Sequence, residues 1–166
     1  MRVALPFVAA VAIQLLQEQP APAQYPTVRK SVAVELVTDK KKPYIEHFED
    51  VPFVTNNKVC LFPGENFGVD VTVNGKAVVV TYNPRHKKAD VEFWFRQQKA
   101  SNNNRQFMIL EVESRLSRML TFNAALIFPE QKRDYDTHIF HVNPKEQNFY
   151  SWPRPTVKLT LEDFRF

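Results

Sequence analysis

The sequence has one cysteine and three glycines in 166 residues, and both shortages exclude classes of protein. The lone cysteine, Cys60, cannot form an internal disulfide, so the core alone must hold the fold. Three glycines leave no glycine-rich loop to cradle phosphates and no Gly-x-Ser-x-Gly motif for a nucleophilic serine. Cys60 lies in an apolar run at 59–62, which predicts a buried thiol acting as a small hydrophobe.

The sequence also lacks an apolar run of the length that crosses a membrane and an Asn-x-Ser/Thr acceptor for N-glycosylation. The apolar stretch at 3–16 is shorter than the roughly 20 residues that a spanning helix needs. Arg2 before this stretch and Ala21-Pro22-Ala23 after it predict a signal peptide over residues 1–23, cleaved after Ala23. A retained N-terminal anchor is the alternative. The missing glycosylation acceptor favours a bacterial envelope or secreted setting, so we expect a periplasmic or extracellular protein.

The charge balance identifies no partner. The net charge of +4 is mildly basic, which gives weak attraction to anionic surfaces. Because an exported protein rarely meets nucleic acid, we expect no nucleic-acid partner. The aromatic residues, 14 Phe, 5 Tyr and 2 Trp, supply enough apolar area for one core. We therefore expect residues 24–166 to form a single domain.

The clearest local pattern is a β-hairpin at 67–82. Asn74-Gly75 stands between two runs of alternating β-branched residues, which is a strong hairpin signal when both turn residues take positive φ. This type I′ turn would pair Val73 with Lys76. The predicted buried face then consists of Phe67, Val69, Val71, Val78, Val80 and Tyr82.

Further strand patterns follow along the chain, separated by turn signals at 63–64, 83–84, 101–104 and 143–144. They lie at 31–38, 44–54, 91–96, 120–128, 137–142 and 156–166. Strands at this spacing predict an all-β fold, and we expect an immunoglobulin-like antiparallel β-sandwich of about seven to nine strands. A small barrel is the alternative.

The stretch at 106–127 fits two structures. Ile109, Val112, Leu116 and Met119 have helical spacing, whereas apolar and charged residues also alternate as in a strand. We favour two strands that turn near 114–117, because the surrounding sequence is rich in strand patterns.

Candidate metal ligands are sparse. Asp134, Asp136 and His138 alternate, so a strand would place them on one face, but a polar loop explains them as well. His47 lies in an acidic segment without a known ligand spacing, and solvated surface explains it better. We therefore predict no metal site and no cofactor.

The segment at 149–155 is the candidate binding site. Its two prolines favour an extended backbone, and Tyr150, Trp152 and Arg154 are residue types enriched at binding hot spots. The alternative is that Tyr150 and Trp152 close one end of the sandwich. The basic clusters at 40–42 and 85–88 are typical of solvated loop tips, or of contacts with anionic lipid or polysaccharide.

Together these features predict an exported, non-catalytic binding or assembly module of the cell envelope. It would engage an envelope or secreted protein through a strand edge or through Tyr150, Trp152 and Arg154. No small-molecule ligand is predicted, and the membrane-barrel alternative fails because Lys158 and Glu162 would face lipid. A small-molecule or metal-ion carrier and a small carboxylate-based hydrolase are the alternative functions.

Overall fold

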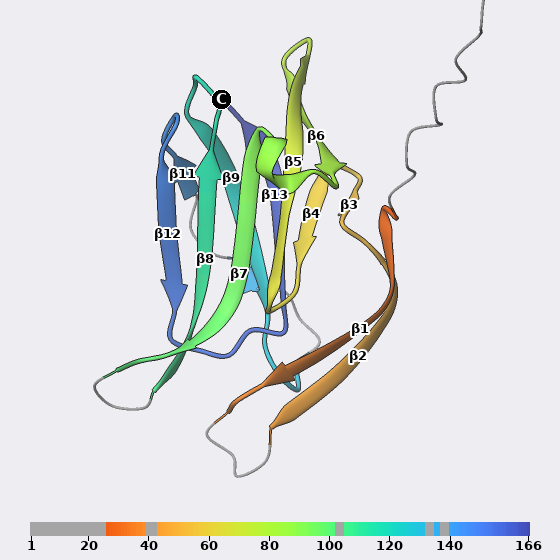
Figure 1. Ribbon diagram of the computed structural model, residues 1–166, viewed down its shortest axis with the longest axis vertical. Helices are drawn as coiled ribbons and strands as arrows, with labels where there is room; N and C mark the ends of the chain where they lie inside the picture. Colours follow the sequence, from red (N-terminus) through yellow and green to blue (C-terminus); the bar gives the residue numbers. More distant parts are fainter. Residues whose placement is uncertain (1–25, 39–42, 102–104, 132–134, 137–139) are drawn as a thin grey trace, which may run out of the picture.

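The computed structural model describes residues 26–38, 43–101, 105–131, 135–136 and 140–166. These residues form thirteen strands and one short 3₁₀ helix, η1 (His86–Lys88). Two antiparallel sheets stack face to face, and a separate hairpin lies beside them (Figure 1). The predicted all-β sandwich is confirmed, and the immunoglobulin-like strand order stays a prediction.

One sheet has five strands, and each pair of neighbouring strands in it is antiparallel. Its strands, from one edge to the other, are β12 (Gln147–Trp152), β8 (Gln106–Ser114), β7 (Val91–Lys99), β5 (Glu65–Asn74) and β6 (Ala77–Asn83). Because β5 lies between β6 and β7, the connection from β6 through η1 to β7 passes β5, whereas β5–β6 and β7–β8 are consecutive antiparallel pairs.

The facing sheet is assembled from the middle and the end of the sequence. Its strands, in order, are β10 (Tyr135–Asp136), β9 (Leu120–Ile127), β13 (Lys158–Arg165), β4 (Lys58–Leu61) and β3 (Val54–Thr55), and β11 (Phe140–Val142) also pairs with β9. The last strand is bulged near Asp163, whose φ is +55°. The bulge lets Phe164 enter the core although it is out of phase with Leu159 and Leu161.

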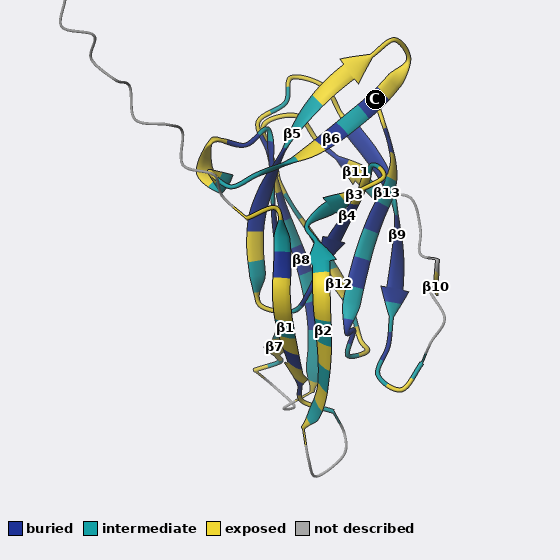
Figure 2. Ribbon diagram, turned by 90° about the vertical axis from the view of Figure 1, so that its right-hand side faces the viewer, coloured by how far each residue is buried: buried dark blue, intermediate teal, exposed yellow. Residues whose placement is uncertain are grey.

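The core lies between the two sheets. Alternate residues of β7, such as Phe93 and Phe95, are fully buried, as the period of two requires. The Phe93 ring meets Phe122 of the opposite sheet edge-to-face, with 6.3 Å between ring centres. Figure 2 shows buried residues along β9 and exposed residues at the far end of the β5–β6 hairpin.

The hairpin of β1 (Val28–Leu36) and β2 (Tyr44–Pro52) forms its own two-stranded sheet. One of its faces packs on the sandwich, because Val34 and Leu36 are buried and the Phe48 ring lies 4.8 Å from the Phe62 ring. Figure 1 shows this hairpin as a ribbon beside the lower part of the two sheets.

Arg29 fastens the hairpin to the sandwich. Its side chain is only 6% exposed and makes a two-pronged ion pair with Glu65, the first residue of β5. The guanidinium also donates to the carbonyl oxygen of Cys60 at 2.8 Å and stacks on the Phe53 ring at 3.8 Å. Burial raises the pKa of the Glu65 carboxyl, against the opposing effect of Arg29.

The β5–β6 hairpin corrects the predicted register by two residues. Asn74 pairs with Ala77 and Val73 pairs with Val78, so the turn residues are Gly75 and Lys76. Positive φ is needed only at Gly75 (φ +63°), as in a type II′ turn, which places glycine at the first central position. A shift of two residues keeps each side chain on its face. The predicted buried face is therefore confirmed despite the wrong register.

The ambiguous stretch at 106–127 forms two strands, β8 and β9, as favoured from the sequence. The number of strands exceeds the predicted seven to nine, partly because the 44–54 pattern divides into β2 and β3. Three strands were not predicted. They are β4, whose sequence is a short apolar run, β10, whose sequence was assigned to a polar loop, and β12, whose sequence was assigned to an extended segment set by prolines.

Candidate functional site: an end groove and an open strand edge

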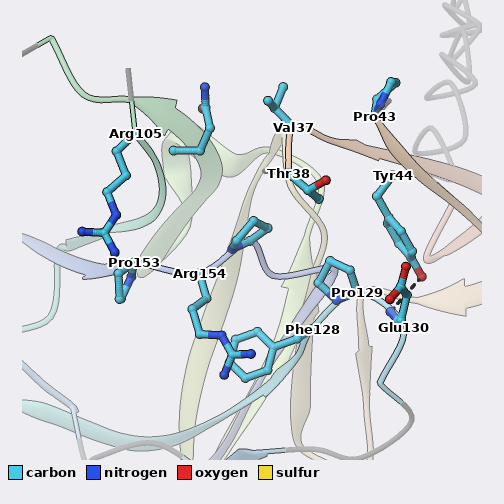
Figure 3. Close-up of a pocket in the computed structure, with 12 residues that line it drawn as sticks. Val37, Thr38, Pro43, Tyr44, Arg105, Phe128, Pro129, Glu130, Pro153 and Arg154 are labelled. Carbon is cyan, nitrogen blue, oxygen red and sulfur yellow. Dashed lines mark hydrogen bonds between the residues drawn. The ribbon is translucent and has the colours of Figure 1, made fainter. Parts of the chain in front are cut away.

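A groove of about 520 Å³ opens at the end of the sandwich where the β1–β2 hairpin lies against it. It is lined by residues 37–38, 43–44, 105–106, 128–130 and 153–155 (Figure 3). These short segments come from the hairpin, the start of β8, the turn after β9 and the loop after β12. The volume falls within the range of small-molecule pockets.

The turn at 128–131 shapes one wall of the groove. The backbone N–H of Gln131 donates to the Phe128 carbonyl oxygen at 3.1 Å, and Pro129 occupies the second turn position. Glu130 follows with φ +63°, a conformation that glycine or asparagine usually adopts at this place in a type II turn. The Glu130 N–H donates to the Tyr44 hydroxyl at 3.4 Å, which ties the turn to the hairpin.

The charges of the groove are separated in space. Arg105 and Arg154 lie on one side, whereas Glu130 and Tyr44 lie on the other (Figure 3). The Arg154 guanidinium stacks on the Phe128 ring, with 4.6 Å between its carbon and the ring centre. Burial and a hydrogen bond to Glu46 raise the pKa of Tyr44, so its hydroxyl stays protonated at neutral pH.

The structure divides the three predicted site residues between two places. Tyr150 and Trp152 are half-buried on the inner side of β12, where both rings pack on Phe140 at 4.5 and 5.9 Å. The Tyr150 hydroxyl donates to the His141 carbonyl oxygen at 2.7 Å, and burial raises its pKa. Arg154 is exposed and lines the groove.

The strand β12 is itself an edge of the five-stranded sheet. Ser114 N–H donates to the Glu146 carbonyl oxygen at 3.0 Å, in the same register as the β12–β8 ladder. Bonded and non-bonded pairs alternate in an antiparallel ladder. The backbone groups of Gln147, Phe149 and Ser151 therefore point away from β8, toward the open side of the sheet.

Two other exposed backbone stretches are closed by side-chain amides that imitate a neighbouring strand. The Asn57 amide donates to the Val78 carbonyl oxygen at 2.9 Å and accepts from the Val80 N–H at 2.8 Å, along the outer edge of β6. The Gln97 amide makes the same pair of bonds to Val37, at 2.8 and 2.9 Å. Within the described residues, the outward groups of β12 receive no such bond.

The other predicted candidates form no site within the residues that the structure describes. Asp134 and His138 lie outside the described residues, and so does the basic cluster at 40–42. His47 is exposed on β2, and the described part of the chain contains no group of three His, Cys, Asp or Glu that could hold a metal ion. Cys60 is buried as predicted, and burial raises the pKa of its thiol to about 11, which keeps it unreactive.

Sequence reasoning missed three features of these sites. Arg105 joins Arg154 in the groove, but no pattern links two arginines so far apart in the sequence. The Glu130 turn is signalled only weakly, by the proline before it. The amide bonds of Asn57 and Gln97 depend on packing between distant strands, which local patterns do not report.

Comparison of the chain with protein-family models, with curated proteins and with solved structures gave no match. Over the residues that the structure describes, no helix has the length and apolar character to cross a membrane.

Proposed function

We propose that this chain is an exported, non-catalytic binding module of the cell envelope that adds an extended strand of a partner protein to β12. The open backbone edge at Gln147, Phe149 and Ser151 carries this proposal. Edge strands attract such pairing because their unpaired N–H and C=O groups form a template. Backbone bonds supply affinity in this mode, and side chains on alternate faces supply specificity.

The side chains around β12 suit this role. Phe149 is 59% exposed on the outer face, where it would meet outward side chains of an added strand. On the inner face, the half-buried rings of Tyr150 and Trp152 would be covered by the inward side chains of that strand. Both predicted aromatic residues thus support the edge from within. Burial of partly exposed aromatic area would add to the backbone bonds.

A proline substitution can remove partner binding at the edge of β12 without unfolding the chain. Ser151→Pro removes an N–H that points away from β8, and edge strands tolerate proline where the N–H faces outward. We expect the free energy of unfolding to change by less than about 1 kcal/mol. Ser151→Ala, which keeps the N–H, is the matched control.

The readout is co-purification from the exported fraction of the host, followed by native mass spectrometry. The wild-type chain and Ser151→Ala should carry a bound protein, and Ser151→Pro should lose it. If Ser151→Pro retains the partner, strand addition at β12 is wrong.

A second measurement does not depend on the stability of the proline variant. Photo-reactive benzoylphenylalanine at Phe149 should cross-link the partner in the native envelope. The same group at Val73, which is 54% exposed at the far end of β5, should not. Equal cross-linking from both positions would show non-specific contact and contradict the proposal.

A further inference from the structure

The end groove is lined by arginine side chains, by a carboxylate, and by aromatic and proline rings. Arg105 and Arg154 bring two guanidinium groups to one side, and Glu130 brings one carboxylate to the other. The Phe128 ring and prolines from three separate segments also line the groove. The site is net positive and has rigid apolar walls.

We propose that this groove binds an acidic saccharide, independently of strand addition at β12. The sugar carboxylate would be held by Arg105 and Arg154, because a guanidinium offers paired N–H donors that match a carboxylate. The C–H face of the sugar ring would lie on Phe128 and the neighbouring prolines. A sugar hydroxyl would donate to Glu130, whose carboxylate has several acceptor positions.

The stacking of Arg154 on Phe128 prepares this arrangement. The ring contact holds the guanidinium carbon 4.6 Å from the ring centre, so fewer conformations are lost when a ligand binds. A planar cation fixed in this way presents its N–H donors in a defined direction. Rigid prolines on the opposite walls lower the cost of binding for the same reason.

Glu130 gives an independent indication. Its φ of +63° is one that a glutamate adopts at a cost and a glycine adopts freely. Residues held in such conformations cluster at ligand sites. Here the conformation puts a carboxylate opposite two arginines, at the mouth of a groove of about 520 Å³. An acceptor for hydroxyl groups at that place fits a saccharide better than a simple anion.

The test is an NMR titration of the full chain with trigalacturonate, with neutral galactotriose as the matched ligand. Trigalacturonate should shift the amide signals of Gln106, Phe128 and Glu130, and its affinity should fall as salt is added. Galactotriose should bind at least about tenfold more weakly, since it lacks the charge-assisted hydrogen bonds. Absence of binding by trigalacturonate, or equal binding of both sugars, overturns the proposal.

Variants locate the site. Arg105→Ala and Arg154→Ala should each weaken trigalacturonate binding about tenfold or more. Arg154→Lys, which keeps the charge and the aliphatic stem, should fall in between because it loses the paired donors. Arg118→Ala is the control. Arg118 also stacks on a phenylalanine, Phe166, at 4.3 Å, and its substitution by alanine removes the same charge. An equal loss in Arg118→Ala would show general charge attraction and overturn the site.

Discussion

Arg29 and Lys30 are neighbours on β1, yet their ion pairs differ in burial and in the number of hydrogen bonds. The Arg29–Glu65 pair is nearly buried and bonded on several sides, whereas the Lys30 and Asp50 side chains are 86% and 67% exposed. Removal of one partner of a buried pair leaves an uncompensated charge, which costs about 3–5 kcal/mol. An exposed pair contributes little to stability, because water and salt screen its charges.

We predict that Arg29→Ala lowers the free energy of unfolding by about 3–5 kcal/mol and that Lys30→Ala leaves it unchanged within experimental error. Denaturant unfolding of both variants at neutral pH measures this difference. Equal effects of the two substitutions would mean that Arg29 does not hold the hairpin to the sandwich.

The Glu92 carboxyl makes the free energy of unfolding depend on pH in the acidic range. Burial raises the pKa of its carboxyl, but hydrogen bonds from His86, Asn66 and Arg115 outweigh burial, so the net pKa is lowered from 4.5. A carboxyl with a lowered pKa in the fold contributes stability above its unfolded pKa and loses it as the pH falls through the folded pKa.

We therefore predict that the wild-type chain loses more stability than Glu92→Gln when the pH falls from 6 to 3. Urea unfolding of the two proteins at both pH values gives the comparison. A wild-type chain that loses no more stability than Glu92→Gln over this interval would show that the pKa of Glu92 is not lowered in the fold.

At the level of whole strands, the edges of the sheets explain how the molecule avoids unwanted pairing. Asn57 closes the outer edge of β6 from a turn where Asn56 and Asn57 both have positive φ, at +48° and +60°. Asparagine tolerates this conformation better than most residues do. The turn therefore both bends the chain and supplies the amide that covers β6.

Asn57→Gly isolates the amide, because glycine keeps the positive φ. We predict a loss of about 1–3 kcal/mol for the two hydrogen bonds and a rise in self-association at the bared edge. Asn56→Gly is the matched control and should show neither effect. Unfolding experiments and analytical ultracentrifugation test both parts, and a monodisperse, fully stable Asn57→Gly would contradict this role of Asn57.

The strands themselves show what the sequence could predict and what it could not. Alternation of buried residues along β7 and β13 is a property of the local sequence, so those strands were predictable. The β5–β6 turn was misplaced by one residue, and the strand register therefore by two, because Asn-Gly suits one turn type, whereas Gly75 alone satisfies another. Residues 147–152 form β12 because they pair with β8, which lies more than 30 residues earlier in the sequence. The local sequence pattern gives no information on this pairing.

On the scale of the whole molecule, the Arg29–Glu65 contact, the groove and the open edge of β12 are linked through shared segments. The hairpin fastened by Arg29 supplies one wall of the groove, and the loop that follows β12 supplies another. The sequence predicts Tyr150, Trp152 and Arg154 as site residues from their types and from the prolines beside them. The sequence does not predict that Tyr150 and Trp152 lie at the strand edge while Arg154 lies in the groove, because this depends on which strand ends meet in the folded chain.

Export is a prediction for the whole chain. We expect the protein recovered from the exported fraction to have an intact mass that begins at Gln24, since residues 1–23 have the pattern of a signal peptide. Intact mass spectrometry reads this directly. A mass that includes Met1 would contradict the predicted cleavage.

The central claim, that β12 offers a free backbone edge to a partner strand, is tested most directly by amide hydrogen exchange along this strand. In the free chain, we expect slow exchange at the N–H groups of Asn148 and Tyr150, which face β8, and fast exchange at those of Phe149 and Ser151, which face outward. With the co-purified partner bound, Phe149 and Ser151 should become slow as well. Slow exchange at Phe149 and Ser151 in the free chain, or unchanged fast exchange in the complex, would contradict strand addition at β12.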